Sequence, residues 1–213
     1  MKLSRKSKIT LLFIAVWMLT VGSGLRIMLA YDNSPGIIAT APTTWPAESH
    51  ISRQSGVATL VMLVHPHCPC SRASIGELAL LMAEIPRPVN ANVLFIKPHQ
   101  FPEQWEKTDL WNSAASIPGV KVDVDDNAAE ARLFGSQTSG QVMLYDINGQ
   151  LVFKGGITAS RGHSGDNDGR RAIVSLLTQH HGDRAETPVF GCPLFEKSSN
   201  DHTKDSCHAF HNQ

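Results

Sequence analysis

The longest apolar run in the chain covers residues 9 to 25 and contains no charged residue. Four basic residues precede it, Lys2, Arg5, Lys6 and Lys8. An apolar helix of about 20 residues spans a bilayer, and positive charge on its N-terminal flank keeps that end in the cytoplasm. We therefore expect residues 1–30 to form a transmembrane helix that anchors an exported domain. A cleaved signal segment is the alternative, because Met28-Leu29-Ala30 is a weak version of the small-residue cleavage pattern.

Residues 31–55 are rich in Pro, Ser and Thr and show no sustained hydrophobic period, which is typical of a linker. The continuous apolar run "VATLVMLV" at 57 to 64 then predicts a strand buried on both faces. A helix follows, because apolar residues recur at helical spacing until two prolines end the pattern: Ile75, Leu78, Met82, Ile85, then Pro86 and Pro88. The folded domain is expected to cover residues 56–182.

The rest of this domain alternates strand and helix patterns. Strands are expected at 92–97 and 120–125, and helices within 102–116, at 127–135 and at 169–181. Two further strands, "VMLYDI" and "QLVFKGG", are joined by Asn148-Gly149, a pair typical of a two-residue hairpin turn. The order β-α-β-α-β-α-β-β-α predicts an α/β fold, with a central mixed sheet flanked by helices on both faces.

Composition limits the range of functions. The chain has 213 residues, of which 42% are hydrophobic, and 19 basic residues balance 19 acidic ones. One core of domain size is expected, and the balanced charge argues against nucleic acid as a partner. We expect no cofactor.

Cys68-Pro69-Cys70 lies between the first strand of the domain and its helix. With Cys68 as N-cap and Pro69 as first helical residue, the Cys68 sulfur would face unpaired backbone N–H groups, which lower a thiol pKa. His65, His67 and Arg72 are candidate cationic neighbours. These residues favour Cys68 as a catalytic nucleophile and Cys70 as its partner. A bridge across one residue is strained, and strain makes a disulfide easier to reduce.

The order of elements resembles the thioredoxin fold, whose active cysteines sit between a buried strand and the following helix. Three segments resemble the RedB-like branch of membrane-anchored thioredoxin-fold proteins: "HPHCPCSRAS", "TSGQVMLYDINGQLVFKGGITASRGHSGDN" and "TPVFGCPL". The resemblance covers about residues 56 to 195 and implies thiol-disulfide exchange with protein thiols or disulfides. In this fold a cis-proline usually faces the active site, and here Gly140 stands at that position.

Two other interpretations of the cysteine pair remain open. Two cysteines and a histidine could bind Cu(I), as in an assembly protein similar to the Sco-type copper carriers, although the cysteine spacing is narrower here. A noncatalytic binding module with an inert disulfide is the other alternative. The polar loop 155 to 170 supplies Arg161 and His163 as further candidate neighbours of the active site.

The polar tail, residues 183–213, contains Cys192 and Cys207 together with three histidines, His202, His208 and His211. In an exported protein a disulfide between Cys192 and Cys207 would persist, and by closing a short loop it would stabilise the fold by about 3 kcal/mol. The alternative is that Cys192 is a remote resolving thiol for Cys68. The histidine spacing matches no familiar metal site.

Overall fold

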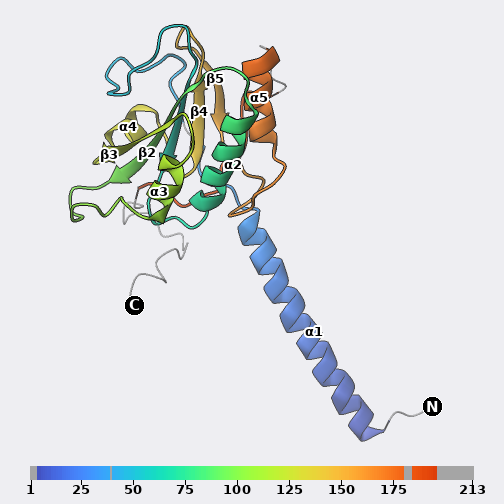
Figure 1. Ribbon diagram of the computed structural model, residues 1–213. Helices are drawn as coiled ribbons and strands as arrows, with labels where there is room; N and C mark the ends of the chain where they lie inside the picture. Colours follow the sequence, from blue (N-terminus) through green and yellow to red (C-terminus); the bar gives the residue numbers. More distant parts are fainter. Residues whose placement is uncertain (1–3, 39, 180–183, 196–213) are drawn as a thin grey trace. The chain divides into compact units, whose positions relative to one another are not determined.

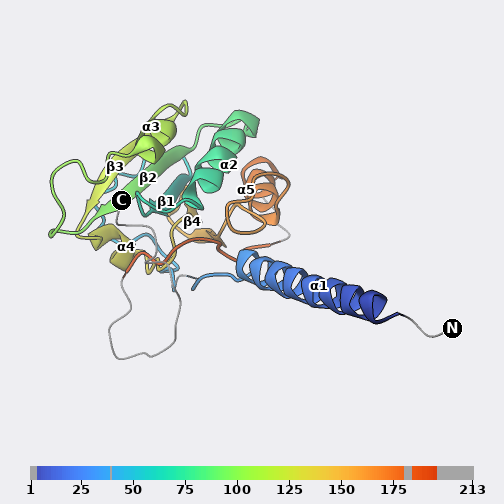
Figure 2. The same cartoon turned by 90° about the horizontal axis from the view of Figure 1, so that it is seen from below.

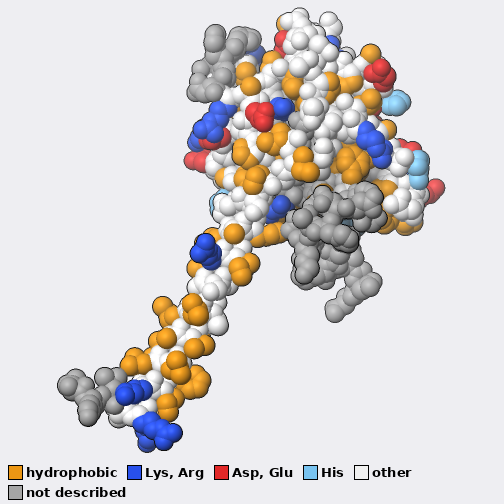
Figure 3. All heavy atoms as spheres, turned by 180° about the vertical axis from the view of Figure 1, so that it is seen from behind, with side chains coloured by type: hydrophobic (Ala, Val, Ile, Leu, Met, Phe, Trp, Pro, Cys, Tyr) orange, Lys and Arg blue, Asp and Glu red, His pale blue; other side chains and the backbone are white. Residues whose placement is uncertain are grey.

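The computed structural model describes residues 4–38, 40–179 and 184–195. The chain divides into two units, one that contains a single helix and one that begins at Pro35. The first helix, α1 (Arg5–Asp32), begins at Ser4, whose hydroxyl accepts a hydrogen bond from the Ser7 N–H at 3.2 Å. Figure 3 shows hydrophobic side chains along α1 and Lys or Arg at its N-terminal end.

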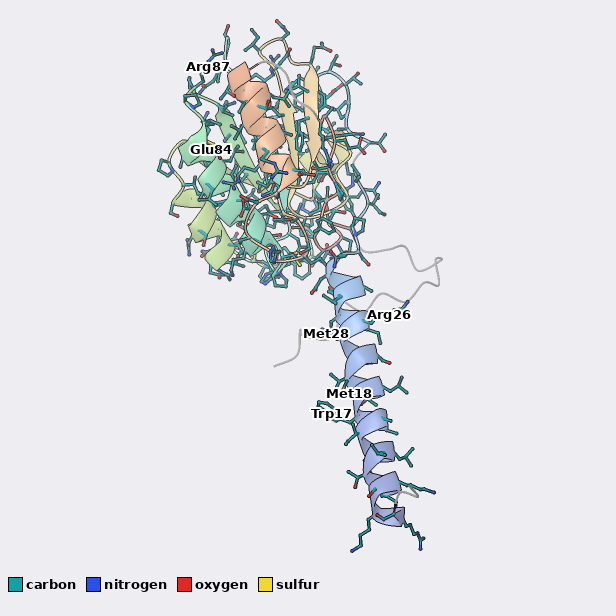
Figure 4. All side chains as sticks on the ribbon, turned by 90° about the vertical axis from the view of Figure 1, so that its right-hand side faces the viewer. Trp17, Met18, Arg26, Met28, Glu84 and Arg87 are labelled. Atoms are coloured by element: carbon teal, nitrogen blue, oxygen red, sulfur yellow. The ribbon has the colours of Figure 1, made fainter. Side chains whose placement is uncertain are left out.

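Helix α1 is long and apolar enough to cross a membrane, and none of its side chains is buried. In Figure 4, Trp17, Met18 and Met28 project outward from it. Membrane anchors and signal sequences share this length and composition. The apolar N-terminal helix expected from the sequence is therefore present, and it ends two residues later than predicted.

The domain is built on five strands: β1 (Thr59–Val64), β2 (Asn90–Lys97), β3 (Val120–Asp126), β4 (Gln141–Tyr145) and β5 (Leu151–Gly155). They lie in the order β3-β2-β1-β4-β5. Strands β1, β2 and β3 are parallel, whereas β4 is antiparallel to both β1 and β5. The central β1 is buried at every position, because helices or chain segments cover both faces (Figure 2).

Four helices alternate with the strands: α2 (Ser71–Glu84), α3 (Asp109–Ala115), α4 (Ala129–Leu133) and α5 (Asp168–Gln179). Figures 1 and 2 show α2, α3 and α5 on one face of the sheet and α4 on the other. This order of elements was predicted, and the parallel crossovers followed by an antiparallel pair make the fold thioredoxin-like.

Two hydrophobic cores fill the space between the layers. Alternate residues of β1 point to opposite faces, so Leu60 and Met62 pack under α2, α3 and α5, while Val61 and Leu63 pack on the α4 side. Because α4 has only five residues, it cannot cover its face alone. Leu194 and partly buried apolar residues complete this second core: Leu151 of β5 and, outside the regular elements, Ala41, Trp45, Ile51 and Phe195.

Segment 35–55 therefore differs from the linker that its composition predicted. The Trp45 ring contacts Phe134 and Tyr145 edge-on at 5.2 and 5.1 Å between centroids. The backbone N–H of Trp45 donates to the Gly149 carbonyl at 2.8 Å, and the Tyr145 hydroxyl donates to the Pro42 carbonyl at 3.0 Å. A segment without hydrophobic period is thus part of the domain, held by a few large side chains and backbone hydrogen bonds.

The hairpin between β4 and β5 is longer than the predicted two-residue turn. The Asp146 N–H donates to the Gln150 carbonyl at 2.9 Å, and the Gly149 N–H donates back to the Asp146 carbonyl at 3.0 Å. Three residues, 147 to 149, therefore lie between the hydrogen-bonded residues Asp146 and Gln150. The Asp146 carboxylate accepts the N–H groups of Asn148 and Gln150, which favours this wider loop.

Candidate functional site

Cys68 lies just past the C-terminal end of the central strand β1, in a turn that leads into α2. The Cys68 N–H donates to the His65 carbonyl at 3.1 Å, and the Cys68 carbonyl accepts from the Ser71 N–H at 3.0 Å. Cys70, not Cys68, occupies the N-cap position, and α2 begins at Ser71. The predicted helix start was early because these two turns precede the first helical residue. The Cys68 side chain is buried, with 1% exposure.

One partner of the Cys68 sulfur comes from the far end of the described chain. The Sγ atoms of Cys68 and Cys192 lie 2.9 Å apart, although 124 residues separate them in the sequence. The Cys192 backbone N–H also donates to the Cys68 Sγ at 3.3 Å. Both cysteines, and Cys70, are free thiols in the structure. Cys192 thus lies beside the Cys-Pro-Cys turn.

Residues 191–194, which we call the docking strand, hold Cys192 in this place. The Ser139 N–H donates to the Cys192 carbonyl at 2.8 Å, and the Leu194 N–H donates to the Gln137 carbonyl at 2.9 Å. Between these bonds, Thr138 and Pro193 form an antiparallel bridge. The docking strand is therefore paired with the segment that leads into β4.

Two glycines permit this close packing. Gly140 has φ +85°, and a Cβ there would lie 2.6 Å from the Ser74 Oγ in α2. A Cβ at Gly191 would lie 2.0 Å from the Ser139 carbonyl oxygen. No cis peptide bond occurs in the described ranges of the chain. At the position of the usual cis-proline, Gly140 in the left-handed region allows the backbone to approach α2, while Gly191 allows the docking strand to approach Ser139.

Ser139 was not singled out from the sequence, yet it joins three parts of the site. Its hydroxyl accepts the His65 N–H at 2.7 Å and lies 2.7 Å from the Ser71 hydroxyl. Its own N–H binds Cys192, as described above. Because Ser139 is fully buried, these bonds fix the turn after β1 against the start of β4. No motif marks such a serine in advance.

The five candidate neighbours of Cys68 lie in different environments. The Arg161 guanidinium donates to the Gly191 carbonyl at 2.7 Å, so Arg161 holds the docking strand. His65 and His67 both pack against Trp105, at 5.5 and 4.7 Å between ring centroids.

Arg72 pairs with Asp109 of α3 at the surface and lowers the pKa of that carboxyl. His163 is exposed, and its N–H donates to the Ser160 carbonyl at 3.3 Å. Arg161 of the loop thus contacts the backbone of Gly191, next to Cys192.

The pKa of one of the three thiols is lowered, and the pKa values of the other two are raised. Hydrogen bonds from the Cys192 thiol, and then from the Cys70 thiol, lower the pKa of Cys68 and outweigh its burial. The hydrogen bond to Cys68 raises the pKa of Cys192 above its usual value, and contact with Cys70 and burial act in the same direction. The hydrogen bond with Cys192 lowers the pKa of Cys70. Contact with Cys68 and burial outweigh this effect, so the pKa of Cys70 is also raised. Of the three thiols, Cys68 is the one whose pKa is lowered.

The part of the chain that the structure describes contains no group of three or more His, Cys, Asp and Glu side chains placed to hold a metal ion. The copper interpretation therefore gains no support from the geometry. Cys207 and the tail histidines His202, His208 and His211 lie outside the described residues, and so does the predicted Cys192–Cys207 disulfide.

No protein-family model and no curated protein matches the chain. Solved structures do match. A conserved protein from Geobacillus kaustophilus is 18% identical with a TM-score of 0.55, over 78% of this chain and 94% of that one. A protein from Sinorhizobium meliloti 1021 is 20% identical with a TM-score of 0.55, over 75% and 93%. The exposed lipoprotein thioredoxin Etrx1 of Streptococcus pneumoniae is 16% identical with a TM-score of 0.43, over 59% and 86%. At these identities the likeness concerns the fold.

Proposed function

We propose that this protein exchanges disulfides with protein thiols on the exported side of a membrane, as the resemblance to RedB-like proteins implies. The observation that carries the proposal is the Cys68 sulfur, which has a lowered pKa at the C-terminal end of the central strand of a thioredoxin-like fold. A thiolate is the nucleophile in disulfide exchange, and a low pKa keeps it charged at neutral pH. Cys68 is then the attacking residue, and a second cysteine completes the exchange.

Cys70 is the second cysteine that the sequence motif suggests. Its thiol interacts with the Cys68 sulfur, which supports a part for Cys70 in the exchange. Helix α1 serves as the membrane anchor in this proposal, with the domain on the periplasmic or extracytoplasmic side.

The test uses the full chain in detergent, reduced and then mixed with insulin as a disulfide substrate. Wild-type protein should reduce insulin in the presence of a dithiol donor, whereas Cys68→Ser should not. Cys207→Ser is the control, and we expect it to retain the activity. If Cys68→Ser reduces insulin as fast as the wild type, the proposal is wrong. Protease added to sealed vesicles of known orientation tests the side on which the domain lies.

A further inference from the structure

We infer that Cys192, rather than Cys70, is the thiol that resolves the mixed disulfide on Cys68, and that the docking strand delivers it. This inference rests on the proposed function. Its basis is the separation of 2.9 Å between the Cys68 and Cys192 sulfurs, within a backbone pairing that holds both residues. A disulfide bond is about 2.05 Å long, so a movement of about 1 Å closes it.

The backbone of the turn disfavours Cys70 in this role. The bond from the Ser71 N–H to the Cys68 carbonyl makes residues 68–71 a tight turn, and Cys70 itself has helical dihedral angles, φ −65° and ψ −28°. A disulfide between cysteines with one residue between them is strained, although the Cys70 thiol lies within hydrogen-bonding reach of the Cys68 sulfur. A Cys68–Cys70 bridge would need the turn to distort, whereas Cys192 arrives from a separate strand and imposes no such distortion.

The docking strand also has features of a bound peptide rather than a loose tail. It forms backbone hydrogen bonds to Gln137 and Ser139, its Gly191 carbonyl is held by Arg161, and Leu194 is buried in the second core. An extended peptide that pairs with a strand edge and places one side chain in a site is a common mode of recognition. Here the chain presents its own cysteine in that way. Because the strand covers Cys68, a partner reaches this sulfur only when the strand lifts.

The exchange proceeds in two balanced steps. The Cys68 thiolate attacks one sulfur of a partner disulfide, so that a Cys68–partner bond forms and the other partner sulfur leaves as a thiolate. Cys192 then loses its proton to solvent and attacks the Cys68 Sγ. The Cys68–Cys192 bond forms as the second partner thiolate leaves, and the partner is reduced while the two cysteines are oxidised. A dithiol reductant restores the starting state.

The order of these steps follows from the charges. Hydrogen bonding to the Cys68 sulfur is the largest cause of the raised pKa of Cys192, and the negative charge of Cys68 adds to it. In the mixed disulfide Cys68 carries no charge, so this charge effect disappears and Cys192 loses its proton more readily. Cys192 is therefore restrained while Cys68 is free and becomes reactive once Cys68 is occupied. Its tether also gives Cys192 an effective concentration of ~1 mM or more at Cys68.

The test is to treat the reduced full chain in detergent with oxidised glutathione and to map its tryptic peptides. Cleavage places Cys192 alone in peptide 185–197 and Cys207 in the peptide that starts at Asp205, while peptide 54–72 holds Cys68 and Cys70. We expect a crosslink between peptides 54–72 and 185–197 in the wild type and in Cys70→Ser, and its loss in Cys68→Ser. In Cys192→Ser, a glutathione adduct on peptide 54–72 should accumulate instead. Cys207→Ser, the control, should behave as the wild type.

Three results would overturn the inference. If Cys70→Ser accumulates the adduct and Cys192→Ser does not, Cys70 is the resolving thiol and the proposed function survives. If the wild type links peptide 185–197 to the Cys207 peptide, Cys192 is structural and exchange through Cys68 again survives. If no variant forms an adduct or a crosslink at Cys68 while near-ultraviolet circular dichroism shows a folded domain, both the inference and the proposed function fail.

Discussion

Gly191→Ala should loosen the docking strand without disturbing the sheet. The added Cβ would lie 2.0 Å from the Ser139 carbonyl oxygen, whereas real Cβ atoms essentially never come closer than 3.0 Å, so the backbone must move by about 1 Å. The hydrogen bond from the Ser139 N–H to the Cys192 carbonyl is 2.8 Å long. The same movement stretches it to about 3.8 Å, beyond the range of about 2.7 to 3.2 Å for such bonds.

The magnitude follows from the bonds that this movement weakens. They are the bond to Ser139 and the bond from the Cys192 N–H to the Cys68 Sγ. At about 0.5 to 1.5 kcal/mol each, their loss weakens the closed strand by about 1 to 3 kcal/mol. Since 1.4 kcal/mol is about tenfold in an equilibrium, the open population should rise about 5- to 150-fold.

The assay is alkylation of Cys68 with iodoacetamide as a function of pH, in a Cys70→Ser background so that peptide 54–72 reports one thiol. The hydrogen bond from Cys192 is the largest cause of the low pKa of Cys68. Gly191→Ala should therefore move the midpoint of the pH profile upward, and it should raise the alkylation rate at alkaline pH, where Cys68 is ionised in both proteins and exposure alone differs.

Gly76→Ala is the matched control, because a Cβ at this exposed position of α2 meets nothing within 4 Å. It should leave the profile of Cys68 unchanged. If Gly191→Ala also leaves both the midpoint and the alkaline rate unchanged, the docking strand does not govern the Cys68 thiol, and the reasoning from its packing is wrong.

Three further predictions concern stability, each measured by urea unfolding of the full chain in detergent. Ser139→Ala should lower the free energy of unfolding by about 1 to 3 kcal/mol, because the His65 N–H loses its acceptor, whereas Ser136→Ala should not, because its equally buried hydroxyl has no hydrogen-bond partner among the described residues. Glu77→Gln should cost about 3 kcal/mol, since this fully buried carboxylate accepts two hydrogen bonds from loop 155–170 and lies 3.2 Å from Arg170; the exposed Glu84→Gln should change stability by less than about 0.5 kcal/mol. Gly76→Ala should stabilise the protein by about 1 kcal/mol through helix propensity, and an unchanged midpoint would contradict this. Equal effects within either matched pair would show that the assigned contacts do not decide stability.

The strands and helices could be predicted because their patterns are local. The apolar run ending at Val64 marked a strand buried on both faces, and the helical spacing from Ile75 onward marked α2, which ends at Glu84 as the following prolines required. Segment 35–55 was misjudged for the opposite reason. Its contribution comes from single residues such as Trp45, whose partners lie about a hundred residues away and leave no period in the sequence.

The residues of the candidate site could likewise be predicted only where the signal is local. Cys68 and Cys70 were found from two adjacent elements, since a thiol between a buried strand and a helix is a local signal. Ser139 carries no such signal, because its role depends on partners from both β1 and the docking strand. The contact between Cys192 and Cys68 joins residues 124 positions apart, and the sequence offered it only as an alternative to a Cys192–Cys207 disulfide, which stays a prediction. Long-range strand pairing decides such contacts, and a single sequence does not encode it as a pattern.

The single residue between Cys68 and Cys70 has a physical explanation in the proposed mechanism. A wider spacing lets one turn of helix supply both the attacking and the resolving thiol, whereas a disulfide between Cys68 and Cys70 would strain the tight turn after β1. A resolving thiol on a separate strand removes that geometric demand from the turn. Cys70 then contributes differently: its hydrogen bond to the Cys68 sulfur helps to lower the pKa of Cys68. On this argument, the short motif supplies a stabilised thiolate, and the docking strand supplies the reaction partner.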